Sequence, residues 1–338
     1  MTIQPSLAAR FASSLVQTIG RPVDGGDRLA LAVSGGPDSM AMLALAAAAF
    51  PGQAIAATVD HGLRASAAEE CAMVARVCAQ LGVEHSTLAA DRAIAGASVQ
   101  AQARALRYRL LIDWALEHGA PLLATAHQAD DQAETLLMRA ARGSGLSGMA
   151  GVRATRRIGE RLLLVRPVLD WRRAELRAIV RRAGLPFVDD PANDDPRHDR
   201  TRFRRLLNDH EWLDAPRLAR TAAHLAEADD ELRAITDWLW RARRMKARSG
   251  GVRIDMADLP RGLRRRLAQR AIGEVRAMAG LDEPSWSPEA NIEPLIDSLA
   301  TGKAATQAGV VVRPDGATWL FREAPPRRPA RAGNRRSA

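Results

Sequence analysis

The chain has 338 residues, 47% of them hydrophobic, which is enough for two domains with a sizeable core. No window of about 18 residues is both apolar and uncharged, which excludes a membrane-spanning helix, and the N-terminus lacks the pattern of a secretory signal. The formal net charge of +10 favours a polyanionic partner, although a bias towards arginine codons accounts for the ratio of arginine to lysine. We therefore expect a cytoplasmic protein.

Apolar runs and helical patterns alternate through the first half of the chain. The predicted strands are 28–34, 54–60, 83–89 and 121–127. The predicted helices are a short amphipathic one within 1–20, followed by 38–50, 67–81, 99–118 and 130–142. Strands that alternate with helices over short connections are typical of a parallel sheet covered on both faces. The expected fold class is therefore α/β.

The pattern changes near the middle of the chain. One more strand, in RLLLVRPVLD, and a helix that ends at Gly184 precede a segment, 189–199, with too much Asp, Asn and Pro for a helix or a central strand. Beyond Asp214 the pattern is mainly helical, and AGVVVRPDGATWLFRE is typical of a β-hairpin. The predicted parts are a catalytic domain over 1–214, a smaller, mostly helical domain with the hairpin over 215–324, and a disordered basic tail over 325–338.

The stretch LALAVSGGPDSMAML, residues 29–43, carries a predicted phosphate site. Its strand runs through two glycines into a helix, whose first backbone N–H groups are unpaired and lie at the positive end of the helix dipole. A Walker A loop needs a lysine, which is absent before Lys246, and GxGxxG does not fit either. The residues expected at the phosphates are Ser34, Gly35, Gly36, Pro37, Asp38 and Ser39, with Asp60 at the carboxyl end of the next strand.

The segment SGGPDS resembles the SGGxDS signature of the PP-loop, or N-type ATP pyrophosphatase, family, whose fold is adenine nucleotide α-hydrolase-like. The resemblance implies that these residues bind ATP, which is cleaved between its α and β phosphates while an oxygen of the substrate is adenylated, and that Asp38 is required for this step. It also accounts for the missing lysine. Backbone amides and hydroxyls would hold the pyrophosphate, while Mg²⁺ and arginines elsewhere neutralise its charge.

Three further blocks follow in the order expected for one branch of that family. VDHGLR at 59–64, TAHQADDQAET at 125–135 and DDPANDDPRHDRTRFRRLL at 189–207 resemble the tRNA(Ile)-lysidine synthetase family. The resemblance implies an ATP-dependent ligase that acts on an isoleucine tRNA with a CAU anticodon. Such enzymes adenylate the C2 oxygen of the wobble cytidine. The ε-amine of free L-lysine then displaces AMP, and the resulting lysidine pairs with A rather than G.

Polar residues at helical spacing mark a predicted lysine site. His127, Asp131 and Glu134 share one face if the helix reaches back to His127, although acids at a solvated helix start give the same pattern. The resemblance implies that all three bind lysine, and that Asp131 or Glu134 also takes a proton from the ε-amine. It assigns Asp130 to the same site or to Mg²⁺. Gln128 stands where the family usually has a second histidine, which puts a titratable group there in doubt.

Arginines at two places are predicted to contact the nucleotide or the tRNA. Arg104 and Arg107 lie one turn apart, as they would on a solvated helix surface, and the similar ARxxRY stretch of the family makes Arg107 the candidate for a catalytic contact with phosphate or the target base. Arg200 and Arg204, four residues apart, and Arg64 are expected to meet the nucleotide or the anticodon backbone.

Two other functions remain open at this point, as does the oligomeric state, a homodimer included. A tRNA thiolase of the same superfamily needs cysteines for sulfur transfer or an iron–sulfur cluster. The two cysteines, Cys71 and Cys78, lie seven residues apart on a predicted helix and match neither a CxxC pair nor a zinc knuckle, so we expect buried free thiols. The second alternative is a tRNA-binding protein with a vestigial ATP site, which would keep the positive net charge but would not adenylate a substrate.

Overall fold

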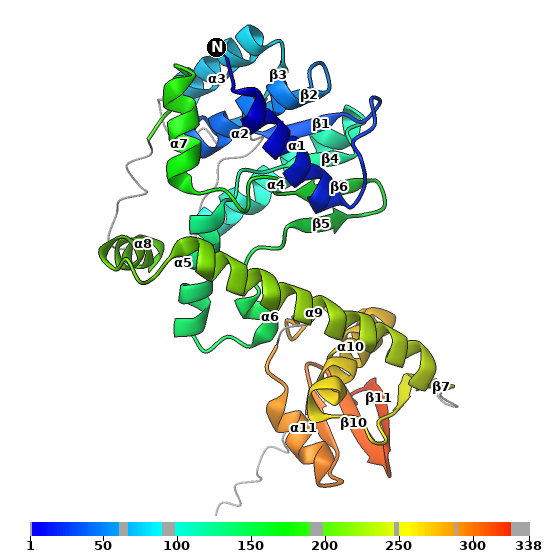
Figure 1. Cartoon of the computed structure of the whole chain (residues 1–338). Coiled ribbons are helices and arrows are strands. Elements are labelled where there is room, and N and C mark those ends of the chain that lie inside the picture. The colour runs from blue at the N-terminus through cyan, green and yellow to red at the C-terminus, as the bar shows by residue number, and fades with distance from the viewer. Residues whose placement is uncertain are drawn as a thin grey trace, which may run out of the picture. The chain divides into compact units, whose positions relative to one another are not determined.

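The computed structural model describes residues 2–60, 67–89, 99–189, 199–246, 250–287 and 290–325, which form two compact units, Met1–Glu227 and Ala228–Ala338 (Figure 1). The predicted basic tail lies outside the described residues, apart from its first residue. None of the helices in the described part of the chain is long and apolar enough to cross a membrane.

The first unit is built on a six-stranded sheet of order β3-β2-β1-β4-β6-β5. The strands are β1 (Leu29–Ala32), β2 (Ala54–Asp60), β3 (Glu84–Ala89), β4 (Leu122–Ala124), β5 (Thr155–Ile158) and β6 (Leu162–Val165). The strand pairs among β3, β2, β1, β4 and β6 are all parallel, which confirms the predicted α/β class. The edge strand β5 is antiparallel to β6 and was not predicted, because its sequence TRRI is polar and half exposed.

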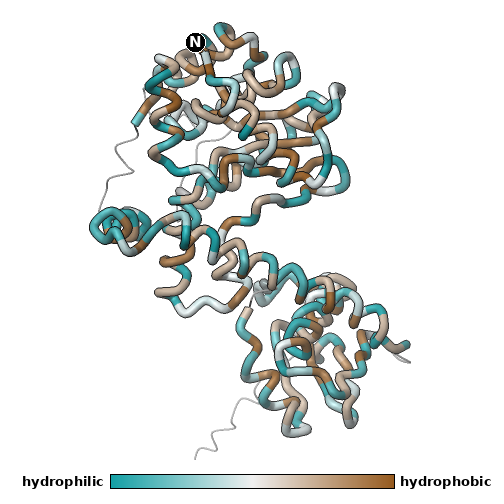
Figure 2. The backbone as a smooth tube through the Cα atoms, in the orientation of Figure 1, coloured by the Kyte–Doolittle hydropathy of each residue, from teal (hydrophilic) through white to brown (hydrophobic). Residues whose placement is uncertain are grey.

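Helices cover both faces of this sheet. They are α1 (Pro5–Ile19), α2 (Pro37–Ala49), α3 (Ala67–Leu81), α4 (Val99–Glu117) and α7 (Arg173–Arg182). Alternate residues of a strand point to opposite faces, so Leu29 and Leu31 of β1 pack with α1, α2, α3 and α7, whereas Ala30 packs on the other face with α4. Figure 2 colours much of the interior of this unit brown, in keeping with a sheet buried on both faces.

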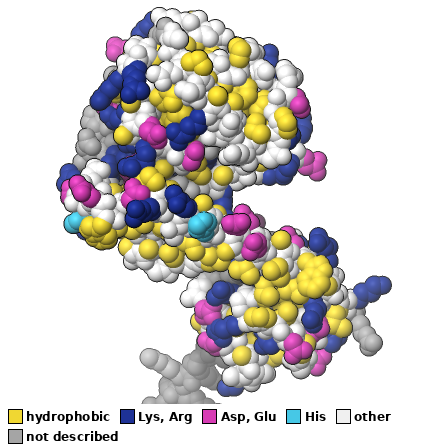
Figure 3. All heavy atoms as spheres, in the orientation of Figure 1, with side chains coloured by type: hydrophobic (Ala, Val, Ile, Leu, Met, Phe, Trp, Pro, Cys, Tyr) yellow, Lys and Arg dark blue, Asp and Glu magenta, His cyan; other side chains and the backbone are white. Residues whose placement is uncertain are grey.

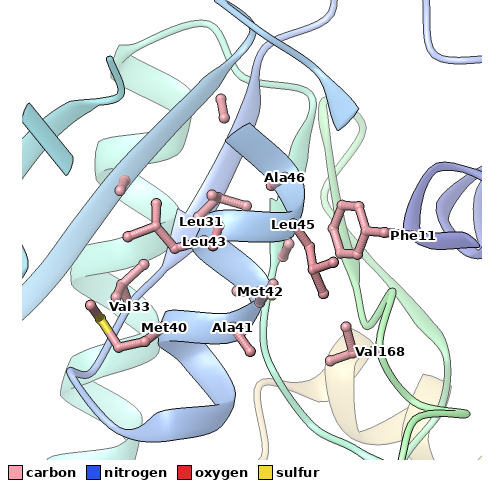
Figure 4. Close-up of a cluster of buried hydrophobic side chains, with 14 of the residues drawn as sticks. Phe11, Leu31, Val33, Met40, Ala41, Met42, Leu43, Leu45, Ala46 and Val168 are labelled. Atoms are coloured by element: carbon pink, nitrogen blue, oxygen red, sulfur yellow. The ribbon is translucent and has the colours of Figure 1, made fainter. Parts of the chain in front are cut away.

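Helix α2 is apolar on all sides and is buried from Ser39 to Ala46. A helix without a polar face is stable only inside a core. Figure 4 shows Leu45 beside Phe11 of α1, with Leu31 and Leu43 in the same cluster. This packing holds the N-terminus of α2 firmly against the end of β1, which is where the glycines lie.

Four helices complete the unit and lead out of it. They are α5 (Ala129–Ala141), α6 (Leu146–Met149), α8 (Asp199–Asp209) and α9 (Ala215–Arg243). Helix α5 begins at Ala129, so it does not reach back to His127. The boundary between the two compact units falls after Glu227, within α9, whereas the sequence suggests a boundary near Asp214, just before that helix begins.

The second unit carries an antiparallel sheet of order β7-β8-β11-β10-β9. Its elements are β7 (Arg244–Met245), β8 (Val252–Asp255), α10 (Arg261–Ala279), α11 (Glu293–Ala300), β9 (Ala305–Gln307), β10 (Val310–Asp315) and β11 (Thr318–Glu323). The predicted hairpin is confirmed as β10–β11, with Gly316 at a φ of 59° in its tight turn. Three further strands extend the hairpin into a five-stranded sheet. Strand β8 lies in the segment GVRIDMADL, residues 251–259, where the sequence predicts a strand, whereas β7 and β9 were not predicted because they are too short to show an alternating pattern.

Candidate active site

The topology of the first unit creates a crevice at the carboxyl ends of its strands. The chain leaves β1 for β2 on one side of it and later returns to β4 on the other side, so the loops after β1 and β4 diverge. A cavity of about 840 Å³ opens at this point. Its lining comes from the loops after β1 and β4, from β2, and from α3, α4, α5, α7 and α8. The cavity therefore collects segments that are far apart in the sequence.

The predicted phosphate residues form the turn between β1 and α2. Gly35 has a φ of +81°, a conformation that a side chain would strain, and its carbonyl accepts a hydrogen bond from the backbone N–H of Val188 at 2.9 Å. The hydroxyl of Ser39 accepts from the backbone N–H of Ser34 at 3.1 Å and donates to the carbonyl of Gly36 at 2.9 Å. Gly36 is the N-cap of α2 and offers no side-chain cap. The turn is thus prearranged around free N–H groups at a helix N-terminus.

Asp38, in the first turn of α2, faces the cavity with part of its carboxylate unpaired. Its Oδ2 lies 3.5 Å from the side-chain amide of Gln128, whereas its Oδ1 is buried without a hydrogen-bond partner among the described residues. Burial raises the pKa of Asp38 to about 6, the negative charge of Asp131 adds to the rise, and Arg173 opposes it. A buried, unsatisfied carboxylate oxygen is costly, and it is typical of a site that awaits a cation or a donor.

Gln128 caps helix α5. Its fully buried side-chain oxygen accepts from the backbone N–H groups of Asp130 at 2.6 Å and Asp131 at 3.2 Å, while its own backbone N–H donates to the Asp131 carboxylate at 3.2 Å. This reciprocal arrangement is a capping box. Gln128 therefore has a positional role that needs no titratable group: it fixes Asp131 and contacts Asp38.

Replacing Gln128 by alanine should lower the free energy of unfolding by about 1–2 kcal/mol, because two N–H groups lose their acceptor in a buried place. Urea denaturation followed by circular dichroism measures this difference. The matched control is Gln17→Ala on the exposed surface of α1, which should change stability by less than about 0.5 kcal/mol. Equal stability of the two variants would contradict the capping role.

Glu134 is fully buried and binds three arginines from two other helices. Its Oε1 accepts from Arg173 Nη2 of α7 at 2.8 Å and from Arg204 Nε of α8 at 3.0 Å, and its Oε2 accepts from Arg200 Nε of α8 at 2.6 Å. Asp131 joins the same network, since its Oδ1 lies 2.6 Å from Arg200 Nη2 and 3.4 Å from Arg173 Nη2. This carboxylate–arginine network links α5, α7 and α8.

The two carboxylates of the network differ in the direction of their pKa shifts and in position. Burial raises the pKa of Asp131 and Glu134 adds to it, although Arg200 and Arg173 work against the rise. Burial also opposes ionisation of Glu134, but Arg173 and Arg200 outweigh it and lower the pKa of that group. Asp131 lines the cavity, whereas Glu134 is not among the lining residues and lies under the arginines. Of the two acids predicted to hold lysine, Asp131 is therefore the one placed to reach a ligand.

Asp130 lies outside this cavity lining. Its carboxylate accepts from the backbone N–H of Arg173 at 2.8 Å and from Arg172 Nε at 3.3 Å, so it joins α5 to the start of α7. The structure thus gives Asp130 a structural contact in place of the predicted Mg²⁺ or lysine contact. Within the described ranges, no group of three or more His, Cys, Asp and Glu side chains is arranged to hold a metal ion.

His127 lines the cavity just before α5, and its Nδ1 lies 3.1 Å from the hydroxyl of Thr125. Burial lowers the pKa of His127 to about 3, and the charges of Arg166 and Arg104 add to this effect. The imidazole is therefore neutral at physiological pH. It can donate or accept one hydrogen bond to a ligand, but it brings no charge to the site.

Helix α4 contributes a cationic wall. Arg104, Arg107 and Tyr108 line the cavity, and the ring centroid of Tyr108 lies 5.3 Å from the guanidinium carbon of Arg104 and 5.9 Å from that of Arg107. Burial and the neighbouring charge of Arg104 lower the pKa of Arg107, although it stays well above neutrality. The phenol of Tyr108 is hydrogen-bonded to the buried Arg166. This wall is suited to an anionic or aromatic group.

Some functional residues were not predicted, and one prediction lies outside the described residues. Arg173 and Arg177 of α7 line the cavity; they lie one helical turn apart, but in an arginine-rich chain such spacing is too common to be a signal. Asp60 is the last residue of β2, and its neighbour Val59 lines the cavity. Arg64 belongs to a segment that the structure does not describe.

Comparisons with known proteins match the chain to one family. Residues 7–211 match the pattern of the PP-loop domain. A tRNA(Ile)-lysidine synthase of Zymomonas mobilis is 40% identical over 324 residues, which cover 95% of this chain and 95% of that protein. A tRNA(Ile)-lysidine synthase of Novosphingobium aromaticivorans is 42% identical over 322 residues, which cover 94% of this chain and 95% of that protein.

Among solved structures, a U34-tRNA thiolase, NcsA, of Methanococcus maripaludis aligns with a TM-score of 0.53 over 65% of this chain and 79% of its own. Its sequence identity of 18% indicates a shared fold and no more. The residues of this chain that surround the cavity fall within the part that matches the PP-loop domain.

Proposed function

Because the chain belongs to the tRNA(Ile)-lysidine synthase family and carries its PP-loop domain, we propose that it ligates free L-lysine to C2 of the wobble cytidine of an AUA-reading isoleucine tRNA. The reaction consumes ATP and yields AMP and pyrophosphate, and we place it in the cytoplasm. The observation that carries the proposal is one cavity that joins a phosphate turn, a cationic wall and the buried acid Asp131. One pocket that holds all three reactants could lower the barrier by about 7–11 kcal/mol through proximity and orientation.

ATP would bind with its phosphates on the turn from Ser34 to Ser39, where the backbone N–H groups and the dipole of α2 favour an anion. Mg²⁺ usually enters such sites with one or two carboxylates and the phosphate oxygens. The residues present fit this ion, because Asp38 has a buried carboxylate oxygen without a partner among the described residues. We therefore assign Asp38, and no longer Asp130, to hold Mg²⁺, which would supply charge neutralisation for the departing pyrophosphate.

The α4 wall would receive the target nucleotide. The C2 oxygen of the cytosine attacks the α phosphorus of ATP, and the bond from that phosphorus to the pyrophosphate oxygen breaks. Arg107 is placed to neutralise negative charge at the reacting phosphate, and Arg104 to meet the backbone phosphate of the RNA. His127, being neutral, would orient the base or the lysine by a single hydrogen bond.

Lysine would bind at the edge of the carboxylate–arginine network. One ammonium group of lysine can replace Arg200 at Asp131, the acid that faces the cavity. The ε-amine must be neutral to attack C2, and Asp131, whose pKa is raised, is the group placed to accept its proton. The C2–N bond then forms as the C2–O bond to AMP breaks. Glu134 would act through Arg173, Arg200 and Arg204, which it holds in place.

The second unit would position the tRNA. Several of its arginines are already paired with acids of the same unit, such as Arg265 with Glu293 at 2.7 Å and Arg266 with the buried Asp229 at 2.7 Å. The second unit has two arginine-rich runs, RARR at 241–244 and RGLRRR at 261–266, and these ion pairs partly neutralise the second of them. We expect the tRNA to use the guanidinium groups that keep solvent exposure, such as Arg241.

Incubation of the protein with ATP, Mg²⁺, labelled lysine and an isoleucine tRNA transcript with a CAU anticodon should convert cytidine to lysidine, seen by mass analysis of the nucleosides. Absence of lysidine with pyrophosphate released would favour a different acceptor of AMP. The sulfur-transfer alternative needs cysteines for sulfur transfer or a cluster, and of the two free thiols on α3 only Cys71 lines the cavity. Burial raises the pKa of both thiols, that of Cys78 to about 12, which disfavours the reactive thiolate.

Replacing Asp131 by asparagine should raise the KM for lysine at least about tenfold, since a charge-assisted contact to an ammonium group contributes about 1.5–3 kcal/mol. The KM for ATP should rise less, because the hydrogen bonds of Asp131 go to Arg200, Arg173 and Gln128, and Asp131 acts on Asp38 of the phosphate turn only through its charge. The control is Asp113→Asn on the exposed side of α4. An equal rise in both KM values would remove Asp131 from the lysine site.

A further inference from the structure

Trp212 is the most exposed large hydrophobic side chain in the described part of the chain, with a relative exposure of 74%. It lies between α8 and α9, in the first unit, and its ring lies against that of His210 with centroids 5.5 Å apart. The backbone N–H of Leu213 donates to the carbonyl of His210 at 3.0 Å and closes a turn beneath the indole. A single exposed tryptophan is not unusual, so its meaning depends on what surrounds it.

Helix α8 connects Trp212 to the active-site cavity. Arg200 and Arg204 line the cavity, whereas Arg202 and Arg205 of the same helix face solvent. Arg202 has only a 4.0 Å contact with Asp199 and keeps 74% of its side chain exposed. From Arg204 to Trp212 the chain spans at most about 18 Å, given the rise of a helix and of an extended segment. Figure 3 shows basic, acidic and hydrophobic side chains together in the region of α8.

We propose that Trp212 stacks on a base of the anticodon loop near the target cytidine, while Arg202 and Arg205 contact the loop phosphates. This inference rests on the proposed function and adds a residue for recognition of the RNA. A base can enter the cavity only when it leaves the stack of its neighbours, which removes stacking energy from the loop. An exposed aromatic ring on the segment that continues an arginine-bearing helix can restore part of that energy, and aromatic rings together with arginines are the means by which many proteins recognise single-stranded RNA.

The position of the surface favours RNA over a second copy of this chain as the occupant. Helix α8 contributes Arg200 and Arg204 to the cavity lining and exposes Arg202 and Arg205 to solvent, so one helix joins the cavity to a surface with cations for phosphate. Asp209 and Glu211 are exposed beside Trp212 in the chain, so the phosphate contacts are assigned to the α8 arginines and the base contact to the ring.

Trp212→Ala should raise the KM for the isoleucine tRNA transcript about tenfold or more, which is the size expected for the loss of one aromatic–base stack. The KM values for ATP and lysine should stay within twofold, and Trp212→Phe should recover most of the tRNA affinity. The matched control is Gln17→Ala, which removes an exposed side chain from α1 of the first unit, a helix that contributes no residue to the cavity lining. It should leave the KM for tRNA unchanged.

A second measurement places the base. Transcripts with 2-aminopurine at single positions of the anticodon loop should show fluorescence quenching by the wild-type protein at one position beside the target, and Trp212→Ala should lose that quenching. An unchanged KM for tRNA in Trp212→Ala overturns the inference, and so does an equal rise in all three KM values. If Trp212→Ala changes only the oligomeric state of the protein in solution, the face is a contact between copies of the chain and the inference is overturned. Lysidine formation by the wild-type protein tests the proposed function separately.

Discussion

Asp38→Ala should reduce pyrophosphate release from ATP by about 100-fold or more, because it removes the one carboxylate that the structure leaves unpaired beside the phosphate turn within the described residues. With tRNA present, the loss should be the same with and without lysine, since adenylation precedes lysine attack. Pyrophosphate release measured with a coupled phosphate assay gives the result directly. Normal release by a folded variant would remove Asp38 from the reaction.

Replacing the Asp38 carboxylate should leave the fold intact. A carboxyl whose pKa in the folded protein lies above its unfolded value contributes stability that is fully present below the unfolded value and is lost as pH rises through the folded value. For Asp38 these values are 3.8 and about 6, so above pH 6 the ionised group weakens the fold. Asp38→Asn should therefore be at least as stable as the wild type at pH 7.5 in urea denaturation. A loss of activity without a loss of stability would separate a functional role of Asp38 from a structural one.

Glu134→Gln should lower the free energy of unfolding by about 3 kcal/mol, because it removes the fully buried partner of three arginines. Arg200 keeps 43% of its side chain exposed and can turn to water, which places the loss at the lower end of the range for a broken buried pair. Asp131→Asn should cost less, because burial raises the pKa of Asp131 and its ionised form is less favoured. Urea denaturation of the three proteins at pH 7.5 tests this order.

The pH dependence gives an independent check on Glu134. Its pKa is lowered in the folded protein because Arg173 and Arg200 outweigh burial, so its contribution is present above the unfolded value of 4.5 and is lost as pH falls through the folded value. The stability difference between wild type and Glu134→Gln should therefore shrink in acid. A difference that is constant from pH 7.5 down to acid would show that the arginines do not depend on the charge of Glu134.

The local patterns of the sequence were enough to predict the α/β class and the place of the phosphate turn. Buried parallel strands such as β1 and β4 are continuous apolar runs, and α2 is a continuous apolar helix that follows two glycines, so both signals lie within short windows. The strand β5 was missed because it is polar and lies at an edge of the sheet. Its pairing with β6, and not the strand propensity of its residues, makes it a strand. The edge strands β7 and β9 of the second unit were missed because they are only two and three residues long, whereas the internal strand β8 lies within a predicted strand.

The sequence alone also predicted which residue types meet at the cavity, namely glycines, hydroxyls, acids and arginines. Only the tertiary structure decided how they are paired, because contacts between α5, α7 and α8 join residues dozens of positions apart. It placed Glu134 under arginines and Asp131 at the cavity, gave Asp130 to the start of α7, and made Gln128 a helix cap. Spacing along a helix shows which side chains share a face, but burial and opposite charges from other helices decide which of them remain free to bind.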